Sequence, residues 1–532
     1  MADHLYFVLV WHMHQPYYWN DEQSFFEFPW VRTHTTKDYL YMARVIRQFP
    51  EMKVTINFAP SLLKQFSMYQ EGCQDLVMMY ARKNAESLTP EEKHFIQPHF
   101  FLAPSSTLTD RFPRFLELRS RVDAGDHLDG QEWRDIQVLY QLLWFDPLTI
   151  EENEGIYRLI RKGRSFSEEE KEILWSTTST MFQNIPAAYQ DLSHRGQVEL
   201  STSPFYHPIL PLLIDGQVAR EPDPSILLSS HCFRHKDDAQ THIQRARDYS
   251  QAYWGETVHG MWPSEGSVSD EALSLMAENG VDWAMSGEEV LFHSLGYSPD
   301  RNEDGVVQNG ERLYHPALFL TPGKRISVFF RDRFLSDLIG FSYQHYDAQQ
   351  AVDDFIRRLQ LLRSSLPVDS HPVVTVVLDG ENSWEYYPDN GYHFLTRLYD
   401  AISQKPDIIP MTPSEYLKQF PDQPVLTHVV AGSWIYGRLN TWIGHPEKNW
   451  AWDQLFRVRD LVDRKAIALS RELKEKVFDI LYQSEGSDWF WWMGDDNPTP
   501  QKREFQEHFV SLLKRICDLI GEEFPRLEWP GR

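Results

Sequence analysis

Two acidic residues follow short apolar runs, and each stands close to a tryptophan. Glu265 lies in "GMWPSEGSVSD" (residues 260–270) near Trp262, and Asp379 lies in "VVLDGENSWE" (residues 376–385) near Trp384. Cleavage of a glycosidic bond needs one carboxylate and one carboxylic acid across a sugar ring. Indole rings suit partners that have both apolar faces and hydroxyl groups. The two segments therefore predict a carbohydrate site if the fold brings them together.

A histidine pair follows the first apolar run, in "LYFVLVWHMHQP" (residues 5–16). His12 and His14 are two residues apart, so an extended backbone points both side chains to the same side. Three interpretations stay open for this pair: structural histidines, hydrogen bonding to a ligand, or zinc binding, since His-x-His on a strand is a common ligand arrangement.

Seven runs of apolar or β-branched residues are typical of parallel strands that are covered on both faces. They are residues 5–11, 52–58, 196–202, 258–262, 281–285, 325–330 and 373–378. Amphipathic helical stretches, such as residues 237–254 and 348–366, lie between many of them. This alternation predicts βα units, and seven strands fit a barrel better than an open sheet. We predict an α/β protein whose (β/α)7 barrel comprises residues 1–71 and 191–411.

Two regions break the alternation. Residues 72–190 show helix-start signals, including Pro90 in "TPEEKHF" and a capping box at Ser167–Glu170, but no clear strand. A further capping box at Thr412–Glu415 begins a largely helical stretch. We predict a helical insertion at residues 72–190 and a C-terminal helical domain at residues 412–532.

Polar residues stand at one end of nearly every predicted strand. In a (β/α) barrel the carboxyl ends of the strands form the active site. Besides the histidines and the two acids, these ends carry Asn57, Glu199 with His207, residues 286–289 and residues 331–337. Taken alone, Glu265 is also explained as a helix-start charge before Asp270, the predicted N-cap, and Asp379 as a turn residue before Gly380. Their joint occurrence favours a site.

Composition narrows the class of partner. The 532 residues include 52 Lys and Arg against 77 Asp and Glu, a net charge of −25, which repels phosphate backbones and anionic membranes. We expect no nucleic-acid partner and no membrane partner, and no stretch approaches the 18 apolar residues of a spanning helix. The 18 Trp, 24 Tyr and 32 Phe, many beside polar residues, suit a sugar or an aromatic-rich core.

The cysteines and the first residues of the chain indicate the cellular compartment. The three cysteines lie far apart and form neither a metal-spaced pair nor a disulfide framework. The segment "MADHLYFVLVWH" has no basic region and no long apolar stretch, so we expect no signal peptide and a cytoplasmic location.

Several of these motifs resemble glycoside hydrolase family 57, and the amylase and amylopullulanase branch most. The matching stretches span most of the chain and are "WHMHQPYY", "PWVRTHTTKDYLYMA", "VTINFAPSLLKQ", "GQVELSTSPFYHPILPLL", "GMWPSEGSVSD", "VVLDGENSWEYYPDNG", "TWIGHPEKNWAW" and "SEGSDWFWWMGDD". The resemblance implies an incomplete (β/α)7 barrel followed by a helical domain. It also implies cleavage of α-1,4 bonds of α-glucans, with α-1,6 bonds as a further option, with retention of configuration and without a metal or other cofactor.

The resemblance also implies residue roles. Glu265 matches the family's nucleophile and Asp379 its acid/base, while His12 and His14 match histidines that line the sugar subsite. The implied sugar-binding neighbours are Glu199, Trp262 and Trp384. One stretch departs from the family pattern: Ser286, Gly287 and Glu288 stand where related chains more often have Thr-Asp-Glu, so the role of this loop stays open.

The chemistry sets expectations for the two acids. Glu265 must be ionised to attack, and we expect a nearby imidazolium, a helix N-terminus and hydrogen-bond donors to keep it so. Asp379 must begin protonated, which burial and the neighbouring Glu381 and Glu385 would favour.

Other functions remain open on these residues. A 4-α-glucanotransferase or a glycogen branching enzyme would use the same carboxylate pair. A zinc-dependent carbohydrate deacetylase would use His12 and His14 as ligands, and a non-catalytic protein would only bind sugar. Trp442 and residues 489–492 fit outer subsites or, as we prefer, the contact between barrel and helices. The oligomeric state stays open.

Overall fold

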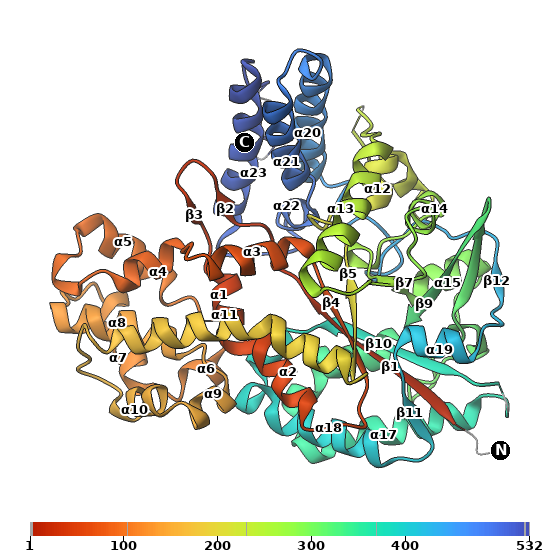
Figure 1. Ribbon diagram of the computed structural model, residues 1–532, viewed down its shortest axis with the longest axis horizontal. Coiled ribbons are helices and arrows are strands. Elements are labelled where there is room, and N and C mark those ends of the chain that lie inside the picture. Colours follow the sequence, from red (N-terminus) through yellow and green to blue (C-terminus); the bar gives the residue numbers. More distant parts are fainter. Residues whose placement is uncertain (1–3, 104, 230, 369, 526–527, 531–532) are drawn as a thin grey trace.

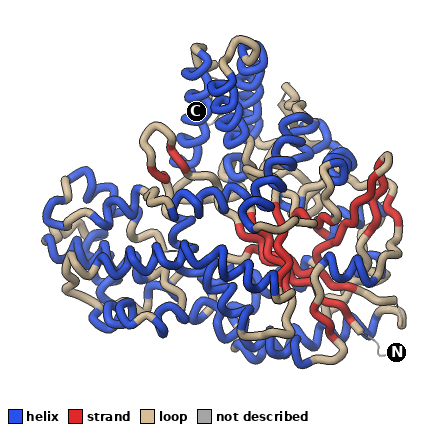
Figure 2. Tube along the Cα trace, in the orientation of Figure 1, coloured by secondary structure: helices blue, strands red, loops and turns tan. Residues whose placement is uncertain are grey.

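The computed structural model describes residues 4–530 except residues 104, 230, 369, 526 and 527. Strands gather in one region of the molecule, helices extend to one side of them, and a group of long helices stands above (Figures 1 and 2). Within the described residues, no helix has the length and apolar character needed to cross a bilayer. The domain limits predicted at residues 1 and 532 lie outside the described residues.

Seven parallel strands close into a barrel. They are β1 (Leu5–Met13), β4 (Val54–Phe58), β5 (Val198–Thr202), β6 (Gly260–Met261), β7 (Trp283–Gly287), β9 (Lys324–Arg331) and β10 (Val373–Asp379). Each pairs with the next in this order, and β10 pairs with both β9 and β1, which closes the ring. These are the seven predicted strands, so the predicted (β/α)7 class is confirmed. Every residue of β1 is buried, as its apolar sequence requires.

Helices return the chain between the strands. The helices beside the barrel are α1 (Trp30–His34), α2 (Leu40–Arg47), α3 (Pro60–Gln70), α12 (Leu210–Ile214), α13 (Lys236–Trp254), α14 (Asp270–Glu278), α15 (Glu288–Leu295), α16 (Arg333–Asp337), α17 (Ala348–Ser365), α18 (Tyr392–Gln404) and α19 (Pro413–Gln419). The helices predicted from the amphipathic stretches at residues 237–254 and 348–366 are α13 and α17. The predicted N-cap of α14 is wrong by one residue: the Ser269 side chain caps the helix, and Asp270 is its first residue.

Short strands extend the sheet outside the barrel. β8 (Ala317–Thr321) pairs antiparallel with β9, β12 (Val425–Leu426) pairs with β8, and β11 (Ile408–Pro410) pairs with β1. A separate hairpin joins β2 (Trp19–Asn20) to β3 (Phe25–Phe26).

Further helices fill the chain between α3 and β5. They are α4 (Leu76–Arg82), α5 (Pro90–His99), α6 (Ser106–Thr109), α7 (Pro113–Asp123), α8 (Gly130–Leu142), α9 (Pro147–Glu152), α10 (Glu154–Lys162) and α11 (Lys171–His194). Thr89 and Glu92 cap α5 reciprocally, as expected from "TPEE". Most of this group lies on one side of the barrel (Figure 1), and α11 runs four residues past the predicted limit at residue 190 before β5 begins.

The end of the chain is helical after α19 and a long loop. It comprises α20 (Pro446–Lys465), α21 (Arg471–Ser484), α22 (Ser487–Trp491) and α23 (Lys502–Ile520). The three long helices stand together in Figure 1. Arg459 of α20 forms a buried ion pair with Asp238 of α13 at 2.8 Å, which fastens these helices to the barrel. The division into three domains stays a prediction.

Candidate active site

A cavity of about 570 Å³ opens where the strands of the barrel end. His12, His14, Glu265 and Asp379 all line it, although they come from three widely separated parts of the chain. His12 and Asp379 are paired residues at the carboxyl ends of the adjacent strands β1 and β10. The structure therefore brings together the four residues with the strongest sequence signal.

Glu265 occupies a short turn between β6 and α14. Its backbone adopts φ +58°, a left-handed conformation that costs a non-glycine residue roughly 1–2 kcal/mol. The carboxylate Oε2 accepts a hydrogen bond from the indole Nε1 of Trp434 at 2.9 Å. This strained turn projects the side chain into the cavity rather than along the helix that follows.

Asp379 is the last residue of β10. Its Oδ2 accepts a hydrogen bond from the Asn382 side chain at 3.1 Å. The next residue, Gly380, has no room for a side chain, because an added Cβ would lie 2.4 Å from the Met13 sulfur. The strand end is thus packed tightly against β1 while the carboxyl group faces the cavity.

Both carboxyl groups bind their proton more tightly than usual. Burial, together with the charges of Asp379 and Asp488, raises the pKa of Glu265 to about 8, although the Trp434 hydrogen bond opposes the rise. Burial also raises the pKa of Asp379, against the effects of Asn382, His14 and Arg331. Groups of this kind titrate as a coupled pair.

The expected imidazolium beside Glu265 is not provided by His12. Burial and the neighbouring His14 lower the pKa of His12 to about 3, so this ring is neutral at physiological pH. Burial likewise holds the pKa of His207 well below its usual value. The expectation that such a charge keeps Glu265 ionised is therefore wrong for both rings.

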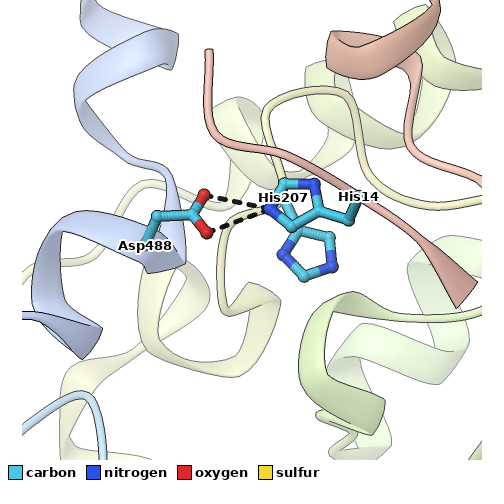
Figure 3. A group of neighbouring side chains, drawn as sticks. All are labelled: His14, His207 and Asp488. Carbon is cyan, nitrogen blue, oxygen red and sulfur yellow. Dashed lines mark hydrogen bonds and ion pairs between the residues drawn. The ribbon is translucent and has the colours of Figure 1, made fainter. Parts of the chain in front are cut away.

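Three imidazole rings form a stack at the edge of the cavity. His14 and His207 have centroids 3.8 Å apart and planes 21° apart, and His12 lies 5.1 Å from His207. His14 Nε2 contacts Asp488 of α22 at 3.0 Å (Figure 3), and His12 Nδ1 contacts Asn57 Oδ1 at 2.7 Å. The H-x-H spacing does place both rings on one side of the strand.

His14, His207 and Asp488 each offer one atom that could ligate a metal, and these atoms lie within 4.8 Å of one another. Imidazole lone pairs lie in the ring plane, however, and the planes of His14 and His207 are nearly parallel. Their lone pairs therefore do not converge on a tetrahedral centre, as zinc requires. In this geometry the cluster fits hydrogen bonding to hydroxyl groups better than metal binding.

Trp262 and Trp384 do not line the cavity. Both side chains are fully buried. Trp262 packs on Trp434 with centroids 5.1 Å apart, and Trp384 donates a hydrogen bond to the Gly380 carbonyl at 2.8 Å. This corrects the prediction that these indoles contact sugar: they support the segments that carry the two acids.

Glu199 also lies away from the cavity. It sits near the amino end of β5, in register with Thr55, two residues before the level of Asn57. Its carboxylate accepts hydrogen bonds from the Trp283 indole at 2.8 Å and from the Ser414 hydroxyl at 2.6 Å. These contacts join the barrel interior to the start of α19, so the predicted contact with sugar is wrong.

Sequence reasoning missed several residues that line the cavity. Asp488 and Trp434 come from the chain after the barrel, where no strand-end rule applies. The aromatic and acidic walls also include Tyr18, Trp30, Trp144, Glu381, Glu385, Tyr386, Trp491 and Trp492. Of the distal tryptophans, Trp491 and Trp492 line the cavity, whereas Trp442 and Trp489 are buried. Trp491 and Trp492 therefore fit the outer-subsite alternative for this stretch better than the preferred contact between barrel and helices, which Trp442 and Trp489 fit.

The arrangement suits chemistry on a sugar acetal. Two carboxyl groups with raised pKa values face one cavity, and indole and imidazole groups surround them. Such a pair can divide the tasks of nucleophile and proton donor across a pyranose ring.

Comparison with known proteins supports this interpretation. A family model described as "Glycosyl hydrolase family 57" matches residues 8–429. A 4-alpha-glucanotransferase from Thermococcus litoralis and an alpha-amylase from Pyrococcus furiosus are each 26% identical to this chain over 237 residues, which is 43% of this chain and 29% of the relative. The match thus spans under a third of the length of these curated relatives.

The fold has relatives among solved structures. A branching enzyme from Thermococcus kodakaraensis, crystallised with glucose, superposes with a TM-score of 0.61 at 14% identity, covering 97% of this chain and 90% of that one. At this identity the likeness shows a common fold.

Proposed function

Because the chain belongs to glycosyl hydrolase family 57, we propose that it cleaves α-1,4 glucosidic bonds of α-glucans by double displacement, with α-1,6 bonds as a second class of substrate. The proposal depends on one observation: Glu265 and Asp379 face the same cavity, which has indole walls. Double displacement retains the configuration at the anomeric carbon and requires carboxyl groups about 5–5.5 Å apart.

In the first step a Glu265 oxygen attacks the anomeric carbon. The bond between that carbon and the glycosidic oxygen breaks, and Asp379 gives its proton to the departing oxygen. The product is a glycosyl ester of Glu265, and Asp379 is left as a carboxylate.

In the second step Asp379 takes a proton from water. The resulting hydroxide equivalent attacks the anomeric carbon, the ester bond breaks, and Glu265 is released as a carboxylate. The sugar leaves with its original configuration, and both side chains regain their starting protonation states.

The active enzyme needs one proton on the pair, and that proton must be on Asp379. The pKa of Glu265, raised to about 8 by burial and by the charge of Asp379, describes loss of the last proton from the pair. The raised pKa of Asp379 places loss of the other proton above the usual range for aspartate. The singly protonated pair therefore dominates between these two steps. Because the charge of Asp379 is one cause of the raised Glu265 pKa, its proton resides mainly on Glu265, and the form that reacts is the one in which the proton has moved to Asp379.

Imidazole nitrogens suit the recognition of sugar hydroxyl groups, because they can donate or accept hydrogen bonds. His12 and His14 line the cavity, and each has one ring nitrogen fixed by a partner, Asn57 or Asp488. Trp491 and Trp492 line it from the α22 side and can stack on glucosyl rings further from the cleaved bond.

Transfer to a second glucan is the other candidate, either as a 4-α-glucanotransferase or as a branching enzyme. A relative and a structural neighbour carry these names, and aromatic walls that hold a sugar acceptor would favour it over water. Both reactions share the glycosyl ester, so the two carboxyl groups have the same roles in each.

A product profile on amylose, pullulan and maltoheptaose tests the proposal. Hydrolysis gives one new reducing end for each bond cleaved, whereas transfer from maltoheptaose gives longer oligosaccharides without a net gain of reducing ends. Absence of any change in all three substrates would contradict both reactions.

We also propose a cytoplasmic location and storage α-glucan as the substrate. The support is the set of unpaired cysteines, Cys73, Cys232 and Cys517, which fits a reducing compartment. Cell fractionation with an antibody against the chain tests this.

A further inference from the structure

A segment of the chain after the barrel lies directly on the turn that carries Glu265. We call residues 428–434 the strap. Val268 and Gly432 exchange backbone hydrogen bonds at 2.8 and 3.0 Å, and the Trp434 N–H donates to the Glu265 carbonyl at 3.1 Å. The strap therefore runs antiparallel to residues 265–268 and pairs with them like a short strand.

Two carboxylates anchor the strap. Asp270 accepts a hydrogen bond from the Val429 N–H and contacts His428 Nδ1, both at 2.7 Å, and Glu221 accepts from the Ala431 N–H at 2.7 Å. Asp270 can do so because Ser269, not Asp270, caps α14. The strap is thus fastened to the same helix start that follows Glu265.

The loop that departs from the family pattern makes room for the strap. The Ser286 hydroxyl donates to the Gly266 carbonyl at 2.6 Å. A Cβ on Gly287 would lie 2.8 Å from the Trp434 Cα, so a side chain there would displace the strap. This gives Ser286 and Gly287 a role that the sequence left open.

The Trp434 indole is held from two sides. Its ring meets the Trp262 ring edge to face at 5.1 Å, and the Arg331 guanidinium lies 5.0 Å from its centre. From this position its Nε1 donates to Glu265 Oε2 at 2.9 Å. The strap thus supplies two donors to one residue, the backbone N–H to the Glu265 carbonyl and the indole N–H to its side chain.

We propose that Trp434 is a positioning residue, which the strap holds in place so that its indole orients the Glu265 carboxylate for attack and stabilises its negative charge. The proposal rests on the nucleophilic role proposed for Glu265. It explains how a left-handed backbone at Glu265 persists, since such strain needs surrounding contacts that fix it.

The groups around Glu265 predict how its pKa changes when the Trp434 indole N–H is removed. Asp379 of β10 and Asp488 of α22 both raise the pKa of Glu265, and the Trp434 N–H lowers it. The Arg331 cation lies on the Trp434 ring and also lowers the pKa of Asp379. Removal of the indole N–H therefore shifts the proton of the pair from Asp379 towards Glu265.

The test is Trp434→Phe, assayed as kcat/KM against pH on maltoheptaose. We expect a plateau about 10- to 100-fold lower, the size of one hydrogen bond to a charged group, because less of the singly protonated pair has its proton on Asp379. We also expect the descending limb to move up by about one pH unit, since Glu265 binds its proton more tightly. A residue that only supports the fold would lower activity without moving this limb.

Trp254→Phe is the matched control. The Trp254 indole is buried in α13 and its N–H has no hydrogen-bond partner in the described residues. We expect it to leave the pH profile unchanged. Trp434→His keeps a ring N–H, and its descending limb should lie between those of the parent and Trp434→Phe. An unmoved limb in Trp434→Phe, or the same shift in Trp254→Phe, would overturn the proposal.

A labelling experiment separates this proposal from the proposed function. A fluorinated glucosyl fluoride that forms a slowly hydrolysed ester is incubated with the parent, and the labelled peptide is identified by mass spectrometry. Labelling at Glu265 in the parent that slows at least about tenfold in Trp434→Phe supports both proposals. Label on another residue of the parent refutes the nucleophile, whereas equal labelling rates in the two proteins refute only the role of Trp434.

Discussion

The imidazole rings of His14 and His207 lie face to face with centroids 3.8 Å apart. His14 Nδ1 and His207 Nε2 are both buried and have no hydrogen-bond partner in the described residues. Unpartnered buried polar atoms cost roughly 1–3 kcal/mol each, so they call for a ligand. His14 lines the cavity, so a sugar hydroxyl can satisfy its Nδ1. A metal fits less well, because the two ring planes are nearly parallel and their lone pairs do not converge on one point.

Chelation tests this interpretation. We expect incubation with EDTA to leave kcat and KM on maltoheptaose unchanged, and zinc to bind the purified chain no more tightly than it binds His14→Ala. A loss of activity in EDTA that zinc restores would instead favour the deacetylase-like arrangement.

Glu265→Gln tests the nucleophile. Without a carboxylate no glycosyl ester forms, so we expect kcat to fall by about three orders of magnitude or more. The amide has nearly the same shape, and the Trp434 N–H can donate to its oxygen, so folding should persist. Parent-like turnover in this variant would refute the role of Glu265.

Thermal unfolding of the same variant supplies an independent check. The pKa of Glu265 is raised from 4.5 to about 8 in the folded chain, so the folded state binds more protons than the unfolded state between these values. Stability of the parent therefore falls as pH rises through this window. Glu265→Gln lacks this loss. The melting temperature of the variant minus that of the parent should therefore increase from pH 5 to pH 8.

Asp379→Asn tests the proton donor. We expect a fall of about two to four orders of magnitude in kcat on maltoheptaose. A glucoside whose leaving group is already acidic needs no proton in the first step. On that substrate the rate of the first step in Asp379→Asn should therefore approach the rate of the parent. Equal losses on both substrates would contradict the assignment.

Much of the barrel follows from local sequence. Runs such as "VVTVVL" and "LYFVLVW" are apolar on both faces and rich in β-branched and aromatic residues, which is typical of short strands covered on both sides. Because the carboxyl ends of parallel strands meet at one end of a barrel, the positions of His12, Glu265 and Asp379 in one site follow from the same reasoning.

Other features depend on contacts that no local pattern contains. Trp262 and Trp384 stand beside the acids in sequence, yet their rings do not line the cavity. The Trp262 ring packs against Gly266 and the Trp384 ring against Gly391, where the missing side chains leave room for them. Trp434 and Asp488 reach the site from beyond the barrel through the strap and α22. Their positions follow from long-range packing, which a single sequence does not display.

The pH dependence of kcat/KM should be bell-shaped. The ascending limb reflects loss of the first proton from the pair, at a pH above the usual value for aspartate because burial raises the pKa of Asp379. The descending limb should lie near pH 8, where the last proton leaves. A rate that keeps rising beyond pH 9 on a substrate with a poor leaving group would contradict a proton donor in this pair.

Glu199→Gln tests whether Glu199 supports the fold or binds sugar. Trp491→Ala serves as the comparison, because it changes a residue expected to bind sugar. Glu199 accepts hydrogen bonds from Trp283 and from both the hydroxyl and the N–H of Ser414. Replacing one acceptor oxygen with an amide should lower the free energy of unfolding by about 1–2 kcal/mol and leave KM unchanged, because the Glu199 side chain does not line the cavity. Trp491 lines the cavity, so Trp491→Ala should raise KM on maltoheptaose several-fold, and more than on maltotriose, since the indole is placed to hold a sugar further from the cleaved bond. A raised KM in Glu199→Gln with an unchanged melting temperature would place sugar where the structure does not.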